Sequence, residues 1–135
     1  MATSITATCE FLVGQPTVVE GSSPDGSLLV VFEDDGETGY FYTVDPTCTA
    51  QSIQDALHIY NVCDVADIEM PALVEIGWSP DSLNAVLLVN GYPHAVFNFQ
   101  HKEACCRTGF PQASPEGSWA TSGHTWRDEA LLAFA

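Results

Sequence analysis

The residue types best suited to chemistry in this chain are an acidic cluster, four histidines and five cysteines. The cluster is Glu33-Asp34-Asp35-Gly36-Glu37, four carboxylates around one glycine. Calcium prefers several carboxylate oxygens on a flexible loop, so Asp34, Asp35 and Glu37 are the candidate calcium ligands. Their spacing does not match an EF-hand loop. Asp and Gly are also the residues expected in a solvated hairpin turn, which is the interpretation we favour, so we expect no resident cofactor.

The thiols and imidazoles suggest a second kind of chemistry. Cys105 and Cys106 are adjacent and precede Arg107, whose positive charge favours a thiolate. With His94 or His101 as a base, either thiol would serve as a nucleophile. No spacing brings these groups together, and the chain lacks the Cys-x-x-Cys and His-x-x-x-His pairs of zinc sites. Alternatively, the two cysteines are small apolar residues that fill space in the core, or free thiols.

Two histidine–tyrosine pairs are the candidate binding residues. On a strand at about 56–62, His58 and Tyr60 share one face and would line a shallow polar site. The alternative places both at the rim of the core, where such side chains are common. Tyr92 and His94 follow an Asn-Gly turn at a hairpin tip, and exposed aromatic side chains on such loops are suitable contacts for a partner. Ordinary turn residues explain this pair equally well.

The elements that must hold these side chains form two similar units. Residues 16–26 (PTVVEGSSPDG) match residues 71–82 (PALVEIGWSPDS) at seven positions when Ile76 is treated as an insertion. Farther along, the similarity continues at an offset of 56 residues. Each unit contains a strand, a Ser-Pro-Asp turn, a second strand, a glycine-containing turn and a third strand. We expect repeat units at about 16–44 and 71–100, through duplication or a shared meander pattern.

The predicted fold is mainly β. Six to seven strands form an antiparallel meander sheet or an open barrel, built from two duplicated three-stranded units. Alternating apolar residues place three strands of the second unit side by side, at 73–78, 84–89 and 93–99. A further strand is expected at about 56–62. The length fits a single domain, 1–135.

A short C-terminal helix is expected to complete this fold. Thr125 is a suitable N-cap, and Asp128 follows three residues later, as in a capping box. Trp126, Ala130 and Phe134 would share one face of the helix. At about ten residues such a helix is not stable alone, so this face must dock on the sheet.

Charge narrows the choice of partners. The chain has 18 acidic and only 3 basic residues, for a net charge of −15. DNA, RNA and anionic membranes all require Lys or Arg clusters, so we exclude them as ligands. An acidic surface attracts basic proteins and peptides instead.

The N-terminus has no secretory pattern, and no apolar run is long enough to span a membrane. The odd, irregularly spaced cysteines favour a reducing cytoplasm.

Three stretches give the chain a resemblance to a known family. Residues 31–42 (VFEDDGETGYFY), 55–61 (DALHIYN) and 90–97 (NGYPHAVF) resemble a family of small bacterial proteins classed as a domain of unknown function. The similarity covers most of residues 16–111. The resemblance implies no activity, cofactor or partner.

The expected function is that of a non-catalytic acidic binding module that recognises a basic protein or peptide. The alternative is a small metal- or thiol-dependent enzyme that uses the Glu33–Glu37 loop, or Cys105 and Cys106 with nearby histidines. A third hypothesis is oligomerisation through an open sheet edge, and the oligomeric state itself does not follow from the sequence.

Overall fold

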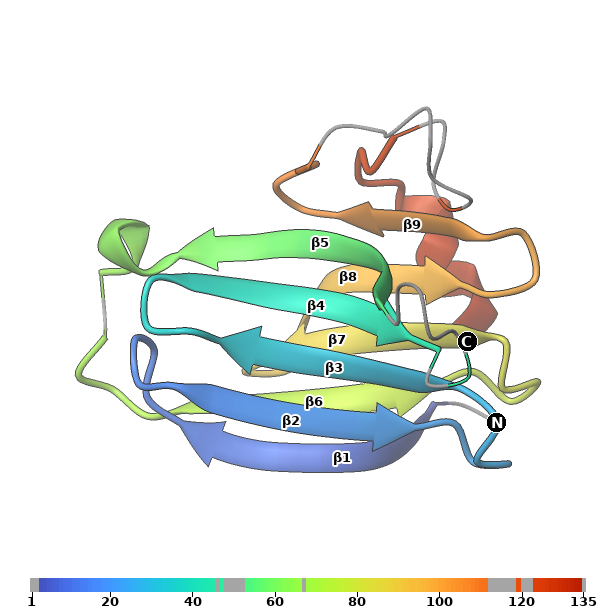
Figure 1. Ribbon diagram of the computed structural model, residues 1–135, viewed down its shortest axis with the longest axis horizontal. Helices are drawn as coiled ribbons and strands as arrows, with labels where there is room; N and C mark the ends of the chain where they lie inside the picture. The colour runs from blue at the N-terminus through green and yellow to red at the C-terminus, as the bar shows by residue number, and fades with distance from the viewer. Residues whose placement is uncertain are drawn as a thin grey trace.

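Two antiparallel sheets face each other in the computed structural model, which describes residues 3–45, 47, 53–66, 68–111, 119 and 123–134 (Figure 1). The five-stranded sheet has the order β1-β6-β7-β8-β9, and the four-stranded sheet has the order β2-β3-β4-β5. The strands are β1 Ser4–Phe11, β2 Thr17–Ser22, β3 Leu29–Asp34, β4 Thr38–Val44, β5 Ile53–Asn61, β6 Ala72–Trp78, β7 Asn84–Val89, β8 Tyr92–Asn98 and β9 Glu103–Cys106. The mainly β prediction is confirmed, with nine strands in the described residues where six to seven were expected.

The core lies between the two sheets and follows the alternation of each strand. Val74, Ile76 and Trp78 of β6 are fully buried, as are the inward residues of the neighbouring β7 and β8. The rings of Phe41 and Phe97 lie 5.1 Å apart between their centroids and join the four-stranded sheet to the five-stranded sheet. Strands β6, β7 and β8 pair side by side, so the predicted order of the second unit is confirmed.

The Ser-Pro-Asp turns of the two units have the same hydrogen bonds. In the first turn, the Ser23 hydroxyl donates to Asp25 over 2.6 Å and accepts from the Leu28 amide over 3.1 Å. In the second turn, Ser79 donates to Asp81 over 2.5 Å and accepts from the Asn84 amide over 3.1 Å. Each Asp carboxylate therefore fixes the serine that closes its own turn, 56 residues from its counterpart.

The two sheets are joined differently along their two sides. On one side, β1 and β2 are edge strands connected by a tight turn. On the other side, the loop after β9 binds the edge of β5: the His58 amide donates to the Phe110 carbonyl over 2.9 Å, and the Thr108 hydroxyl donates to the His58 carbonyl over 2.6 Å. Among the described residues, unpaired strand edges are therefore concentrated at β1 and β2.

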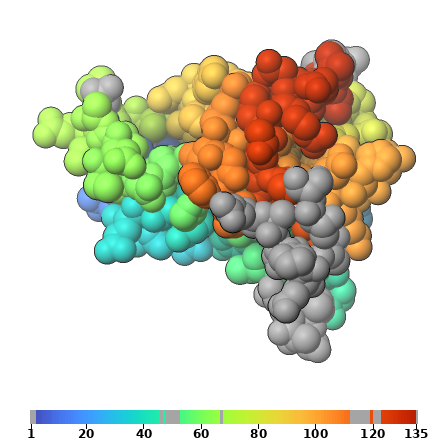
Figure 2. Space-filling model, turned by 90° about the horizontal axis from the view of Figure 1, so that it is seen from above, coloured from blue at the N-terminus to red at the C-terminus, as the bar shows by residue number. Residues whose placement is uncertain are grey.

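The C-terminal segment, residues 123–134, differs from the predicted capped helix. Thr125 forms a parallel bridge with Cys106, so it extends the sheet edge and caps no helix. A 3-10 helix, η2 (Asp128–Phe134), follows. Its apolar side chains, with Trp126, pack on the outer face of the five-stranded sheet, and Figure 2 shows the red C-terminal segment against the orange β8 and β9. The prediction that this segment docks on the sheet is confirmed.

Replacing Trp126 with alanine should expose the thiol of Cys105. Trp126, Ala130 and Phe134 pack against the cluster that contains Cys105, which is only 1% exposed. Loss of one aromatic contact favours local opening, so we expect alkylation of Cys105 to become about tenfold faster, measured by peptide mass spectrometry. The matched change Leu132→Ala removes an exposed side chain of the same segment and should leave the rate unchanged. Equal rates in both variants would contradict the packing described here.

Within the part of the chain that the structure describes, no helix has the length and apolar character needed to cross a membrane.

Candidate functional site

The acidic cluster contains a buried carboxylate that is already fully engaged. Asp34 is 1% exposed and ends β3. It accepts hydrogen bonds from the Gly14 amide over 2.8 Å, the Gly36 amide over 2.8 Å and the Tyr60 hydroxyl over 2.7 Å. Three donors satisfy the needs of a buried carboxylate. Asp34 therefore ties the β1–β2 turn, the β3–β4 turn and β5 together.

Asp35 and Glu33 of the cluster also accept hydrogen bonds within the protein. Asp35 accepts the amides of Glu37 and Thr38, which lowers the pKa of its carboxyl group. Glu33 accepts the hydroxyl of Tyr42 on the opposite side of the strand from Asp34. Among the described residues, no group of three or more His, Cys, Asp or Glu side chains is arranged to hold a metal ion. The geometry is that of the hairpin turn, which was the favoured interpretation.

A bulge in β5 separates His58 from Tyr60. Gly39 pairs with Tyr60 and Tyr40 pairs with His58, so Ile59 is the extra residue. Tyr60 therefore turns toward the core, where its ring lies over Gly39, and a Cβ at that glycine would be 2.6 Å from the ring. His58 lies on the outer face beside the ring of Tyr40, at 5.0 Å between centroids. The prediction that His58 and Tyr60 share one face is wrong, although both line one hollow of about 270 Å³.

His58 instead belongs to an acidic-aromatic face, the outer surface of the four-stranded sheet formed by Glu20, Glu33, Tyr40, Tyr42 and His58. The register places Glu20 and Tyr42 on either side of Val31. Burial, a 2.8 Å hydrogen bond to Glu33 and the charges of Glu33 and Glu20 raise the pKa of Tyr42 to about 12. The tyrosine therefore stays neutral, and the negative charge of this face resides on its glutamates.

Tyr92 and His94 lie on the other sheet, next to a cation. The guanidinium carbon of Arg107 lies 4.6 Å from the centre of the Tyr92 ring and 3.7 Å from that of Trp126. Arg107 also donates through Nε to the Pro93 carbonyl over 3.0 Å. Burial, and then the charge of Arg107, lower the pKa of His94. This hairpin thus holds the C-terminal segment through a cation–π stack.

The adjacent cysteines face opposite sides of β9. Cys105 packs under the C-terminal segment, whereas Cys106 belongs to the core between the sheets. Burial raises the pKa of the Cys105 thiol, although Arg127 and Arg107 act in the opposite direction. The Cys106 thiol donates to the carbonyl of Phe110 over 3.4 Å. His101 is exposed on the turn before β9, and the hydrogen bonds of the Cys106 thiol go to Thr108 and Phe110 rather than to a histidine.

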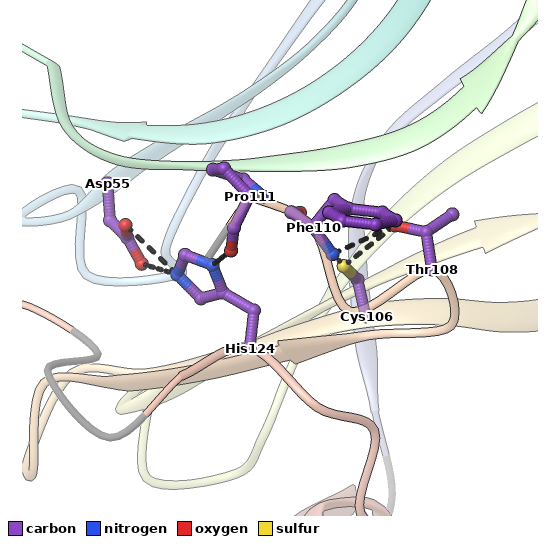
Figure 3. A network of polar contacts seen from close by, with 6 residues as sticks. All are labelled: Asp55, Cys106, Thr108, Phe110, Pro111 and His124. Atoms are coloured by element: carbon purple, nitrogen blue, oxygen red, sulfur yellow. Dashed lines mark hydrogen bonds and ion pairs between the residues drawn. The ribbon is translucent and has the colours of Figure 1, made fainter. Parts of the chain in front are cut away.

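A buried histidine–carboxylate pair joins β5 to the C-terminal segment (Figure 3). His124 is 3% exposed, and its Nε2 lies 2.9 Å from the nearer oxygen of Asp55. Its Nδ1 lies 2.6 Å from the carbonyl oxygen of Pro111. A carbonyl oxygen only accepts, so Nδ1 carries a proton. Burial opposes protonation, but the Asp55 carboxylate and the Pro111 carbonyl outweigh it and raise the pKa of His124.

This pair has the residue types of a catalytic diad. A general base needs a free ring nitrogen within reach of a nucleophile. Both nitrogens of His124 are bonded to acceptors, and the Cys106 thiol, also drawn in Figure 3, is bonded to the carbonyl of Phe110. The pair is therefore a structural link. No local pattern predicts this pair, because 69 residues separate the two partners.

Comparisons with known proteins confirm the family resemblance that the motifs at 31–42, 55–61 and 90–97 indicate. An uncharacterized protein of Haemophilus influenzae is 40% identical over 111 residues, which cover 82% of this chain and 69% of that protein. No solved structure matches. The family model of DUF2251, described as an uncharacterized protein conserved in bacteria, matches residues 11–135. The chain therefore belongs to this bacterial family of unknown function.

Proposed function

We propose that this protein is a non-catalytic binding module that recognises a basic protein or peptide through the acidic-aromatic face. The observation that carries the proposal is the composition of that face: two tyrosines and a histidine beside the carboxylates of Glu20 and Glu33. Lysine and arginine side chains are attracted both to carboxylates and to the faces of aromatic rings.

The distribution of charge along the chain supports this choice of face. Residues 1–101 contain no lysine and no arginine, and they include all four strands of the face. The three basic residues, Lys102, Arg107 and Arg127, all lie farther along the chain. A cationic partner therefore meets no lysine or arginine of this chain on the four-stranded sheet, and long-range attraction will speed its association.

The same reasoning disfavours the hairpin that carries Tyr92 and His94. Arg107 already occupies the space between Tyr92 and Trp126. A second cation at this place would be repelled by the first, so this hairpin is a poor site for a basic partner.

The described cysteines Cys9, Cys63, Cys105 and Cys106 are free thiols, which supports a reducing compartment such as the cytoplasm.

The proposal predicts salt-sensitive binding of a cationic probe. A fluorescein-labelled oligolysine peptide should bind the protein at low salt and dissociate as salt is added, as measured by fluorescence anisotropy. The double change Glu20→Gln and Glu33→Gln should weaken binding about threefold to tenfold, because each exposed ion pair contributes little on its own.

The matched control is the double change Glu75→Gln and Glu129→Gln, which removes the same charge from the opposite sheet and the C-terminal segment. It should weaken binding far less. Equal losses in the two double variants would show that net charge alone attracts the peptide, and the proposed face would then be rejected. Binding that is unchanged at high salt would reject the electrostatic mechanism.

A further inference from the structure

An apolar pocket lies at the turn between β1 and β2, and β2 also carries Glu20 of the acidic-aromatic face. It has a volume of about 480 Å³, within the range of about 300–1,000 Å³ that is usual for ligand pockets. Phe11, Leu12, Pro16 and Pro71 provide apolar surface, and Cys9 and Glu10 complete one side. The lining ends at Thr17, the first residue of β2, so the pocket adjoins the strand that carries Glu20.

The pocket is held in shape by contacts on both sides. Phe11 is 7% exposed, and its ring meets that of Phe32 edge-on at 5.3 Å between centroids. The turn that forms the wall is fixed by the hydrogen bond from the Gly14 amide to Asp34. The two prolines restrict their own backbone torsions. A preformed site of this kind loses little conformational entropy when it binds a ligand.

Further exposed apolar side chains are neighbours of lining residues. Leu12, which lines the pocket, is 40% exposed, Met70 precedes the lining residue Pro71 and is 65% exposed, and Leu73, which is 39% exposed, pairs with Glu10. Exposed apolar side chains on an otherwise acidic protein indicate an interaction site. A second copy of this chain is a poor occupant, because each copy carries a net charge of −15. Charge complementarity favours a basic peptide instead.

We infer that this pocket receives an apolar side chain of the basic partner, so that the recognised peptide has a large apolar residue flanked by Lys or Arg. The inference rests on the proposed function and adds a sequence preference to it. The apolar residue would occupy the pocket, and the neighbouring cations would lie near Glu10 and along β2 toward Glu20. Apolar burial would then supply affinity that is insensitive to salt.

Two labelled probes test this inference: an oligolysine peptide, and the same peptide with one central leucine. We expect the wild-type protein to bind the leucine-containing peptide about tenfold more tightly, which corresponds to partial burial of one leucine side chain. Leu12→Gln should abolish this advantage and leave the binding of plain oligolysine unchanged. The matched control Leu132→Gln changes a 73% exposed leucine of η2 and should retain the advantage.

Cys9 provides an independent readout because it lines the pocket, whereas the exposed Cys63 is not among the lining residues. The leucine-containing peptide should slow alkylation of Cys9 and leave that of Cys63 unchanged. If the protein binds oligolysine but the leucine adds no affinity and no protection, the inference is overturned while the proposed function stands. If neither peptide binds, the proposed function fails and this inference fails with it.

Discussion

Asp34→Ala is expected to lower the free energy of unfolding by about 3–5 kcal/mol, because it leaves three donors without their acceptor. These donors are the amides of Gly14 and Gly36 and the hydroxyl of Tyr60. Urea denaturation followed by tryptophan fluorescence measures the change. Of the four carboxylates in residues 33–37, only this one is buried, so an effect of this size is expected at no other acidic position of the loop.

Asp35→Ala is the matched control for this prediction. Asp35 is exposed and accepts two amides within its own turn, so its loss should cost about 1 kcal/mol, as for the loss of a capping residue. Equal effects at the two positions would contradict the role given to Asp34.

His124→Gln is expected to lower the free energy of unfolding by about 3 kcal/mol near pH 6, and by less as the pH rises. The variant leaves Asp55 with no charged partner in a place where its side chain is 12% exposed. The link contributes most when His124 is protonated. Denaturation of the wild type and the variant at a series of pH values between about 5 and 9 measures the difference.

The sign of this pH dependence follows from the raised pKa of His124. The folded protein binds the proton more tightly than the unfolded chain, whose histidine pKa is about 6.5. The stabilisation is therefore complete below the unfolded pKa, and it is lost as the pH rises through the higher folded pKa. Titrating groups that do not contact His124 occur in both proteins and cancel in the difference. His101→Gln, at an exposed turn, should show no such trend, and an identical trend would contradict the assignment.

The second repeat unit was predictable because its signals are local. Short turns connect β6, β7 and β8, and each strand alternates apolar residues. The sequence pattern therefore predicts which of these strands pair. The Ser-Pro-Asp turns show the same principle, since Asp25 and Asp81 bind only their own turns. β1 was missed even though Ala7, Cys9 and Phe11 alternate, because its partner, β6, lies about 65 residues away in the sequence.

The candidate site was predicted less well than the fold, for two physical reasons. The bulge at Ile59 depends on how β5 meets β4, and one extra residue moves Tyr60 to the opposite face from His58. Sequence alternation alone cannot locate such a bulge. The second reason is distance along the chain: neither Asp55 and His124 nor Gly14 and Asp34 share any spacing pattern, and each pair forms only after the sheets have assembled.

The pairing of β1 with β6 has a consequence for biosynthesis. β1 is the first of the nine described strands to be synthesised, but its partner β6 appears only after the whole β2–β5 meander has been made. That meander can form early from its own hairpins, whereas its apolar face remains uncovered until the second sheet emerges. The nascent chain therefore passes through a period in which the inward face of the β2–β5 sheet is uncovered, and β1 has no strand to pair with until β6 has been made.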